Sequence, residues 1–196
     1  GAVAYLSKSQ YGKNTEEIMR NNDRNYTTGC AANSATQGGT DGCQNAYHTP
    51  NGVKASTTGN IYGIYDISGG SWEMISAYVD NGHDNLRNYG SSIIYAVSKY
   101  KDVYLKGSTD EQVNNYGLAI NQKGDAVYET SNNIGGSYAW FNYDSYMPTA
   151  GGPWFIRGGH WANIGTAGAF SFGGTNGGVY SNDSGFRPVL VVNAGL

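Results

Sequence analysis

The chain has 196 residues, of which only 14% are charged, and its formal net charge at pH 7 is -3. The sequence contains no cluster of Lys and Arg, which argues against a nucleic-acid partner, and its longest aliphatic run, residues 189–192, is far too short to span a bilayer. Gly (30 residues) and Tyr (17 residues) are abundant instead, so we expect a polar but weakly charged surface. The length predicts one domain with a core of its own.

The first 59 residues are rich in Gly, Ser, Thr and Asn and predict little regular structure. Asn14, followed three residues later by Glu17, has the pattern of a helix cap and predicts one short helix. Residues 21–58 carry no apolar periodicity and are punctuated by glycines, which indicates a long loop. We therefore expect residues 1–59 to form a loop-rich N-terminal part.

Cys30 and Cys43, the two cysteines of the chain, both lie in this loop. A disulfide between them would remove about 3 kcal/mol of unfolded-chain entropy, and a polar segment without a core gains most from such a link. We expect this disulfide, which places the protein outside the cell; the alternative is two free thiols in a cytosolic loop. A zinc site is disfavoured because His48 is the one histidine nearby and no second cysteine pair exists.

The densest apolar motif covers residues 60–74, where apolar side chains surround a Gly-Gly turn that precedes Trp72. We expect this segment to lie in the core, with Trp72 buried. Its glycines match neither the dinucleotide-binding fingerprint nor the phosphate-binding loop of nucleotide hydrolases. Asp66 and Glu73 could be a carboxylate pair for glycoside hydrolysis, but we expect both to face arginines within the core instead.

The middle of the chain is polar and predicts fewer regular elements. Residues 79–92 are expected to form a loop and residues 93–97 a strand. Polar residues at 108–112 have capping patterns for a short helix that runs toward Tyr116. We expect residues 80–150 to be an inserted segment that lies over the core.

The last third of the chain alternates in the manner of strands. We expect strands at residues 154–157, 169–172 and 185–191. The phenylalanines in the last two strands should lie in the core, namely Phe170, Phe172 and Phe186.

Arg157 and Arg187 lie within otherwise apolar strands. A guanidinium in such a place needs partners for its donors, and Asp66 or Glu73 would supply them. The residues expected to have structural roles are Asp66, Trp72, Glu73, Arg157, Phe186 and Arg187.

Three of these motifs resemble the formylglycine-generating-enzyme (sulfatase-modifying factor) branch of C-type lectin folds. Residues 60–73 are similar to its Asn-x-x-Gly-Leu-Tyr-Asp-Met-x-Gly-Asn-Val-Trp-Glu-Trp signature, residues 157–161 to its Arg-Gly-Gly-Ser-Trp, and residues 185–187 to its terminal Gly-Phe-Arg. The resemblance implies an α+β, C-type-lectin-like domain over residues 60–196. Such a domain would be loop-rich, with a short twisted antiparallel sheet and one or two short helices.

The sequence departs from this family at the residues that carry its oxidase chemistry. The family has a reactive cysteine pair near the C-terminal end of the core, but no Cys follows Cys43 here. Residues 167–172 replace the arginines that usually follow Arg-Gly-Gly-Ser-Trp, and Gly70 stands where the family has Asn. No nucleophile elbow or zinc-binding histidine motif occurs in the sequence either. We therefore expect no enzymatic activity, and a formylglycine-generating type of oxidase is the least favoured alternative.

The resemblance extends to two groups of proteins that are not enzymes. The same fold branch includes the variable proteins of diversity-generating retroelements, which diversify the residues between Arg-Gly-Gly and Gly-Phe-Arg. Residues 5–7, the two-cysteine loop and residues 63–73 are also similar to the C-terminal heads of prepilin-type proteins from gut Firmicutes. These likenesses imply either ligand binding or filament assembly.

Residues 162–183 are the candidate binding segment because two predicted strands bracket them and they carry a single charge, Asp183. Aromatic rings mixed with Asn, Ser and Gly are the composition of antibody binding loops, although ordinary surface loops of this chain would share it. Trp161 could lie in the core instead. The candidate ligand-binding residues are His160, Trp161, Asn163, Asn176, Tyr180, Asn182 and Asp183.

These features predict an extracellular or cell-surface recognition domain, such as an adhesin or receptor-binding head, of bacterial or phage origin. Its partner would be a protein or a glycan on a cell surface; a pilin-like filament subunit, whose partners are copies of itself, is the alternative. No cofactor is expected, while structural calcium on loop oxygens stays open because no acidic run marks a site. The chain begins at Gly1 without Met, so we expect that a targeting or anchoring segment has been removed.

Overall fold

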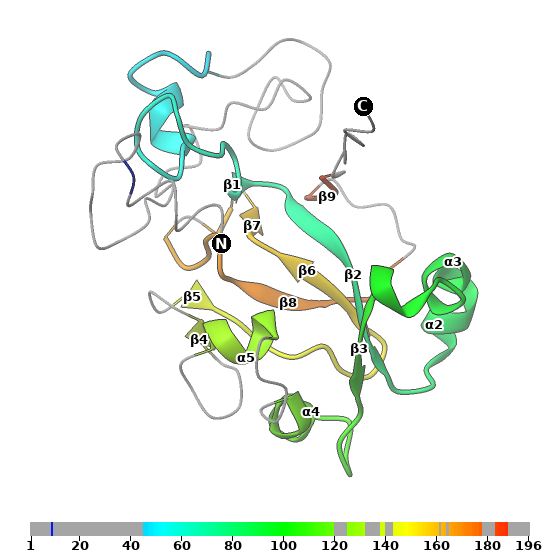
Figure 1. Ribbon diagram of the computed structural model, residues 1–196. Helices are drawn as coiled ribbons and strands as arrows, with labels where there is room; N and C mark the ends of the chain where they lie inside the picture. The colour runs from blue at the N-terminus through cyan, green and yellow to red at the C-terminus, as the bar shows by residue number, and fades with distance from the viewer. Residues whose placement is uncertain are drawn as a thin grey trace.

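The computed structural model describes residues 9, 45–119, 125–131, 138–139, 143–160, 162–163, 165–177 and 183–187. These residues form a mixed α+β structure around one five-stranded sheet (Figure 1), which confirms the broad fold class expected from the sequence. The strand order is β3-β2-β6-β8, and β9 also pairs with β2. The strands are β2 (Trp72–Asp80), β3 (Asp102–Leu105), β6 (Trp154–Arg157), β8 (Phe172–Thr175) and β9 (Ser184–Gly185).

Strand β2 is the centre of the sheet and pairs with three other strands. It runs antiparallel to β6, but parallel to β3 and to β9. The sheet is therefore mixed rather than antiparallel as expected. Parallel neighbours need a long crossover, and residues 81–101 provide one for β3 as three short helical segments. These are α2 (Asp84–Tyr89), α3 (Ser91–Ile94) and η3 (Ser98–Tyr100).

The helical crossover corrects two expectations for the middle of the chain. Residues 79–92 are not a loop, because they complete β2 and contain α2, and residues 93–97 do not form a strand. Helix α2 starts where the His83 ring accepts a hydrogen bond from the backbone N–H of Asn85, at 3.1 Å between Nδ1 and N. Ile93 and Ile94 favour a strand by propensity, but packing against the sheet decides their conformation.

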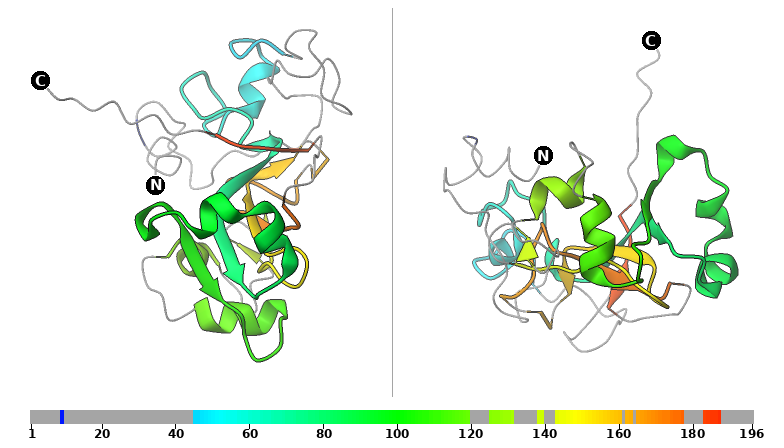
Figure 2. Two further views of the ribbon diagram at one scale, coloured as in Figure 1. Left: turned by 90° about the vertical axis from the view of Figure 1, so that its right-hand side faces the viewer. Right: turned by 90° about the horizontal axis from the view of Figure 1, so that it is seen from below.

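Helices cover the sheet on both sides. Helices α2 and α3 lie on one side of β2 and β3, whereas α4 (Gln112–Ala119) and α5 (Ala126–Thr130) lie on the other (Figures 1 and 2). The helix expected to run toward Tyr116 is confirmed as α4. Four α-helices in the described part of the chain exceed the one or two expected, because the crossover is helical as well.

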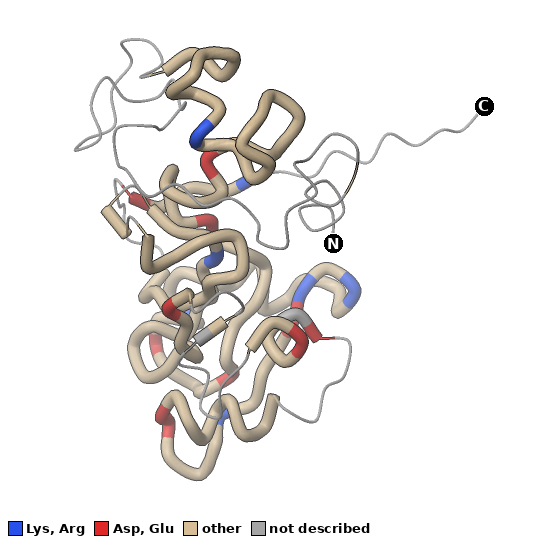
Figure 3. The backbone as a smooth tube through the Cα atoms, turned by 90° about the vertical axis from the view of Figure 1, so that its left-hand side faces the viewer, with Lys and Arg blue, Asp and Glu red and all other residues tan. Residues whose placement is uncertain are grey.

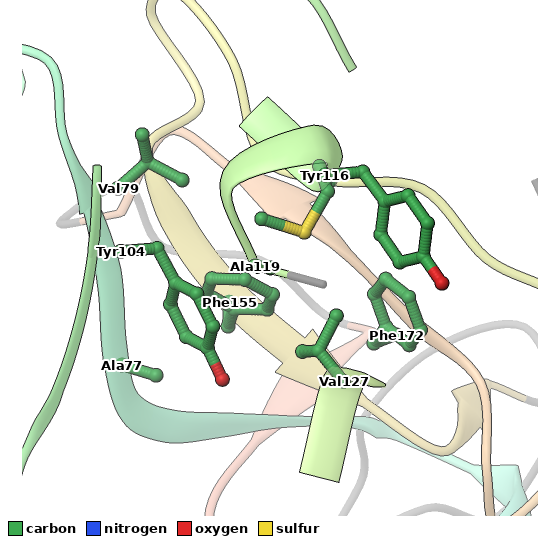
Figure 4. Packing of buried hydrophobic residues seen from close by; sticks show 9 residues of the cluster. Ala77, Val79, Tyr104, Tyr116, Ala119, Val127, Phe155 and Phe172 are labelled. Atoms are coloured by element: carbon green, nitrogen blue, oxygen red, sulfur yellow. The ribbon is translucent and has the colours of Figure 1, made fainter. Parts of the chain in front are cut away.

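Each side of the sheet has its own apolar cluster. The smaller cluster joins Tyr78 and Trp154 to Leu86 of α2, with Ile93 and Ile94 packed against it. The larger cluster fills the space under α4 and α5 (Figure 4), and burial of Phe172 there and of Phe170 nearby confirms two of the three expected core phenylalanines. The members of the larger cluster are Ala77, Val79, Tyr104, Tyr116, Ala119, Val127, Met147, Phe155 and Phe172.

Short elements complete the described structure. Strand β1 (Ser68–Gly70) pairs in parallel with β7 (Gly159–His160), and β4 (Tyr138–Ala139) pairs with β5 (Tyr143–Asp144). A 3-10 helix, η2 (Gly52–Ala55), precedes them. The expectation that all of residues 60–74 lies in the core is wrong at Ile61 and Tyr62, which are exposed, because that part forms a surface turn before β1.

Several expectations fall outside the described residues. The helix at Asn14 and the disulfide between Cys30 and Cys43 belong to this group. The division at residue 59 and the inserted segment stay predictions; the structure adds that residues of β3, α4 and α5 share one cluster with β2 and β6. Within the described ranges, no helix has the length and apolar character needed to cross a membrane.

Candidate functional site

The predicted binding face is built around His160, the last residue of β7. Pairing of β7 with β1 places His160 beside Gly70. The turn that follows is closed by Asn163: the His160 N–H donates to Asn163 Oδ1 at 2.8 Å, and the Asn163 N–H donates to the His160 carbonyl at 2.9 Å. These two bonds hold the Asn163 side chain and backbone against the backbone of His160.

Two further chain segments meet His160. Trp72 starts β2, and its ring lies 6.1 Å from the His160 ring between centroids, with 34° between the ring planes. The Trp72 N–H donates to the carbonyl of Asp183 at 2.6 Å, so the residue before β9 is fixed here as well. We call Trp72, His160, Asn163 and Asp183 the His160 cluster. It joins three segments that are far apart in the sequence.

The His160 cluster is polar but carries little charge. Burial lowers the pKa of His160 below its usual value, while the nearby Asp183 carboxylate acts in the opposite direction. The imidazole is therefore neutral at pH 7, and Asp183 is the one charged group of the cluster. All four residues are partly exposed. Within the described residues, neither Asn163 Nδ2 nor the Trp72 indole nitrogen makes a hydrogen bond, so both can donate to a ligand.

Charged residues are scattered along the described chain without a run of one sign (Figure 3). Among the described side chains, no group of three or more His, Cys, Asp or Glu could hold a metal ion. The chemistry that the cluster offers is a ring face, neutral hydrogen-bonding groups and one carboxylate.

Asn176 does not join the His160 cluster. It follows β8 at Thr175, whose partner in the ladder is Trp154 at the start of β6, whereas His160 lies beyond the end of β6 at Arg157. Strand β6 alone carries the chain roughly 10 Å from Trp154 to Arg157, and His160 lies beyond it. Trp161, Tyr180 and Asn182 lie outside the described residues. The structure thus brings His160, Asn163 and Asp183 together and leaves Asn176 at the other end of the sheet.

Arg187 has the structural partners expected for it. Its Nε donates to Glu73 Oε1, and its Nη2 donates to the Tyr65 carbonyl at 2.9 Å. Burial lowers the pKa of Arg187 and the nearby Asp66 carboxylate acts against this shift, so Asp66 also faces the guanidinium. Asp66 itself has a left-handed backbone with a φ of 57°. These contacts fix the chain after β9 against the start of β2.

Arg157 has different partners from those expected. Glu73 lies opposite Arg157 in the β2–β6 ladder, but its carboxylate pairs with Arg187. The Arg157 guanidinium lies 5.5 Å from the centroid of the Phe172 ring. Burial lowers its pKa, and the nearest opposing charges are Asp125 and Asp102. Its role is to cover the larger apolar cluster with a cation stacked on an aromatic ring.

Phe186 corrects another expectation, because its side chain is 76% exposed and is not in the core. Strand β9 ends at Gly185, and Arg187 turns toward Glu73. The contacts of Arg187 with Glu73 and with the Tyr65 carbonyl, rather than burial of Phe186, fix this part of the chain.

The sequence predicted a buried Trp72, but the structure leaves it partly exposed in the His160 cluster. The reason is its position, because Trp72 follows Gly69, Gly70 and Ser71 and begins a strand rather than lying inside one. A ring at a strand end packs on one side only, and this position is the signal in the sequence that could have identified it.

Comparisons with known proteins identify no relative of this chain: no family model matches it, and neither a curated protein nor a solved structure does.

Proposed function

We propose that this protein is an extracellular ligand-recognition domain, an adhesin or receptor-binding head, and that the His160 cluster is its contact surface. The observation that carries the proposal is the meeting of Trp72, His160, Asn163 and Asp183 from three separate segments. An aromatic face beside short polar groups is the composition of surfaces that bind ligands.

The chemistry of the cluster favours a neutral saccharide among the ligands of a cell surface. The apolar face of a sugar ring can stack on Trp72, while its hydroxyls can accept from Asn163 Nδ2 and donate to the Asp183 carboxylate. The chain after β9 adds one more exposed ring, Phe186, two residues beyond Ser184, which is the partner of Trp72 in the ladder. The neutral state of His160 adds no charge that would demand an acidic ligand.

The resemblance of residues 60–73, 157–161 and 185–187 to the formylglycine-generating branch of C-type lectin folds supports the same reading. In that branch the residues between Arg-Gly-Gly and Gly-Phe-Arg are variable in the binding proteins, and here His160 and Asn163 lie between those two triplets. The lectin-like fold and the absence of oxidase activity are part of this proposal.

Binding to a glycan array and to bacterial and host cells tests the proposed function. Two variants change the cluster without removing its backbone bonds: Asn163→Asp keeps the Oδ1 acceptor but loses the Nδ2 donor, and Trp72→Leu removes the ring. We expect each to weaken binding at least about tenfold, the loss of roughly one good contact. Asn176→Ala is the matched control, because Asn176 is exposed at the far end of the sheet.

The proposal is wrong if the parent protein binds none of these surfaces, or if Asn176→Ala weakens binding while both cluster variants retain it. Far-UV circular dichroism and a urea unfolding curve show whether each variant is folded. Binding to protein-coated surfaces but to no glycan would show that the ligand is not a saccharide, while the proposal of a recognition domain would still hold.

The extracellular location has a chemical test of its own. A disulfide between Cys30 and Cys43 would leave no thiol for alkylation in the denatured, non-reduced protein, and reduction would expose two thiols to the reagent. Mass spectrometry of the alkylated protein reads the result, and alkylation of both cysteines without reductant would contradict the expected compartment.

A further inference from the structure

Strand β3 forms one edge of the five-stranded sheet. Within the described residues only β2 pairs with it, so the outer side of β3 is open (Figure 1). The other end of the sheet is not open in the same way, because the N–H of Tyr146 donates to the carbonyl of Phe172 in β8 at 3.0 Å. An open edge presents backbone donors and acceptors that another strand can use.

The side chains of β3 are unusual for an open edge. Tyr104 is buried in the larger apolar cluster, but Val103 and Leu105, on the opposite side of the sheet, are 37% and 60% exposed. Tyr95 and Tyr100, which lie shortly before β3, are exposed as well. Helices α2 and α3 cover Tyr78, the partner of Val103 in the ladder, but leave the edge strand itself uncovered.

We propose that β3 pairs with β3 of a second copy of this chain, in antiparallel orientation and centred on Tyr104, and so joins two sheets into one. In this register Asp102 lies opposite Lys106 of the partner subunit, and Val103 lies opposite Leu105 of the partner subunit. A twofold axis through the centre repeats both contacts, so the interface contains two ion pairs and two apolar pairs.

The charges select this register among the symmetric ones. In an antiparallel pair, residues that lie opposite each other have their side chains on the same face of the sheet. A twofold axis perpendicular to the sheet must therefore pass through a residue paired with its own copy, and the alternative registers are centred on the neighbouring residues. Centring the pair on Val103 would set Asp102 against Tyr104 of the partner subunit and would carry Lys106 beyond the end of the partner strand, so both ion pairs would be lost. Lysines at an edge also oppose pairing with unrelated strands, since an unpaired ammonium would be buried.

The proposed dimer leaves the His160 cluster accessible. Strand β3 pairs with residues 77–80 at the end of β2, whereas the cluster begins at Trp72, the first residue of β2. Two clusters on one dimer would bind a repetitive cell surface at two points. Such bivalent binding can exceed the affinity of a single site by about 10²- to 10⁴-fold. The dimer itself does not depend on the proposed ligand-binding role.

Sedimentation velocity of the full chain, from about 1 to about 200 µM, tests the dimer. We expect a concentration-dependent monomer–dimer equilibrium for the parent. Lys106→Asp sets two carboxylates against each other in both pairs and should weaken association at least about tenfold. The double variant Asp102→Lys/Lys106→Asp exchanges the charges and should restore it. Lys54→Asp, the same charge change on exposed η2, should leave association unchanged.

Two results would overturn the proposed dimer. One is a parent that stays monomeric over the whole concentration range. The other is a dimer that Lys106→Asp does not weaken, because the subunits would then meet elsewhere. Since Asp102 lies near Arg157, the double variant could fail to fold. Leu105→Lys covers that case: its side chain is exposed in the monomer, so it should fold and still weaken the dimer by removing both apolar pairs.

Discussion

The ion pair between Arg187 and Glu73 offers a measurement at the scale of single residues. Only 14% of the Glu73 side chain is exposed, and Arg187 also donates to the Tyr65 carbonyl. We expect Arg187→Met to lower the free energy of unfolding by about 1 to 2 kcal/mol, because Glu73 then loses its charged partner. Urea unfolding curves give this difference.

The chain contains a matched control for this prediction. Arg87 and Asp84 form an ion pair in which 67% and 72% of the side chains are exposed. Solvent screens such a pair, so Arg87→Met should change the free energy of unfolding by less than about 0.5 kcal/mol. Equal losses for the two arginines would show that shielding of Glu73 has no effect on the strength of its ion pair.

Gly158, which joins β6 to β7, allows a second prediction about a single residue. Its φ is +76°, and a Cβ there would lie 2.6 Å from the carbonyl oxygen of Ile67. Gly82 has a similar φ of +72°, but nothing lies within 4 Å of its Cβ position. Gly82→Ala should therefore cost about 1 kcal/mol of backbone strain, whereas Gly158→Ala should cost about 3 kcal/mol in all.

Thermal and urea unfolding of both alanine variants separate strain from collision. The two changes share the backbone penalty, so the difference between them reports the contact with Ile67. If Gly158→Ala is no more destabilising than Gly82→Ala, the backbone at Ile67 and Gly158 shifts easily to admit the Cβ. The contact between these two residues then does not hold the His160 turn in place.

At the scale of elements, Asp125 connects a helix to the sheet. Its Oδ1 accepts from the N–H groups of Val127 and Tyr128 at the start of α5, and its Oδ2 accepts from the hydroxyl of Tyr104 in β3. Burial, and then the hydrogen bond to Asp125, raise the pKa of Tyr104, so the phenol stays protonated and donates.

The double variant that removes both partners of this link should lose less free energy of unfolding than the two single variants lose in total. We expect Asp125→Ala to lower the free energy of unfolding by about 2 to 3 kcal/mol and Tyr104→Phe by about 1 kcal/mol. The double variant should lose less than the total, because both changes break the same bond. A double-mutant cycle from urea unfolding measures the coupling, and strict additivity would show that the hydroxyl does not contribute to the anchoring of α5.

The elements that the sequence predicted correctly depend on local patterns. Residues 154–157 form a short apolar run that ends at an arginine, and the caps near residue 110 mark α4. The errors arise where distant contacts decide. Two isoleucines at 93 and 94 prefer a strand in isolation, but the cluster around Trp154 holds them in a helix. Alternation around Phe186 was visible, but which side faces the core depends on Glu73, a residue far away along the chain.

At the scale of the whole molecule, His160 makes stability depend on pH. Its pKa in the folded protein lies below the ordinary value of 6.5, so the unfolded chain binds the proton more tightly. The contribution of the neutral imidazole is complete above about pH 6.5 and is lost as the pH falls from there toward the lower, folded pKa.

A comparison of two proteins isolates this effect from other titrating groups. Between pH 7.5 and pH 5.5, the parent should lose more free energy of unfolding than His160→Gln, which carries no titrating group at this position. Unfolding curves at several pH values measure the difference. Parallel pH profiles for the two proteins would show that His160 is as easily protonated in the fold as in the unfolded chain.

The candidate site could be predicted from the sequence only in part. Asn163 and Asp183 belong to the bracketed segment 162–183 and His160 shortly precedes it, and the structure gathers all three. Asn176 belongs to the same segment, yet β8 carries it to the opposite end of the sheet, because a strand moves the chain about 3.3 Å per residue. Closeness in sequence does not determine at which end of a strand a residue lies. For this reason the prediction was correct for His160, Asn163 and Asp183 but wrong for Asn176.

Strand β2 pairs with β3, which follows it closely in sequence, and with β9, which lies more than a hundred positions later. Strand β3 follows β2 closely in sequence, but the contact of Glu73 with Arg187 closes a loop of 114 positions. Contacts at such separation form slowly, because the entropy of a long loop is lost before the contact rewards it. The ion pair that fixes the start of β2 to Arg187 therefore carries a larger loop-closure entropy than the pairing of β2 with β3.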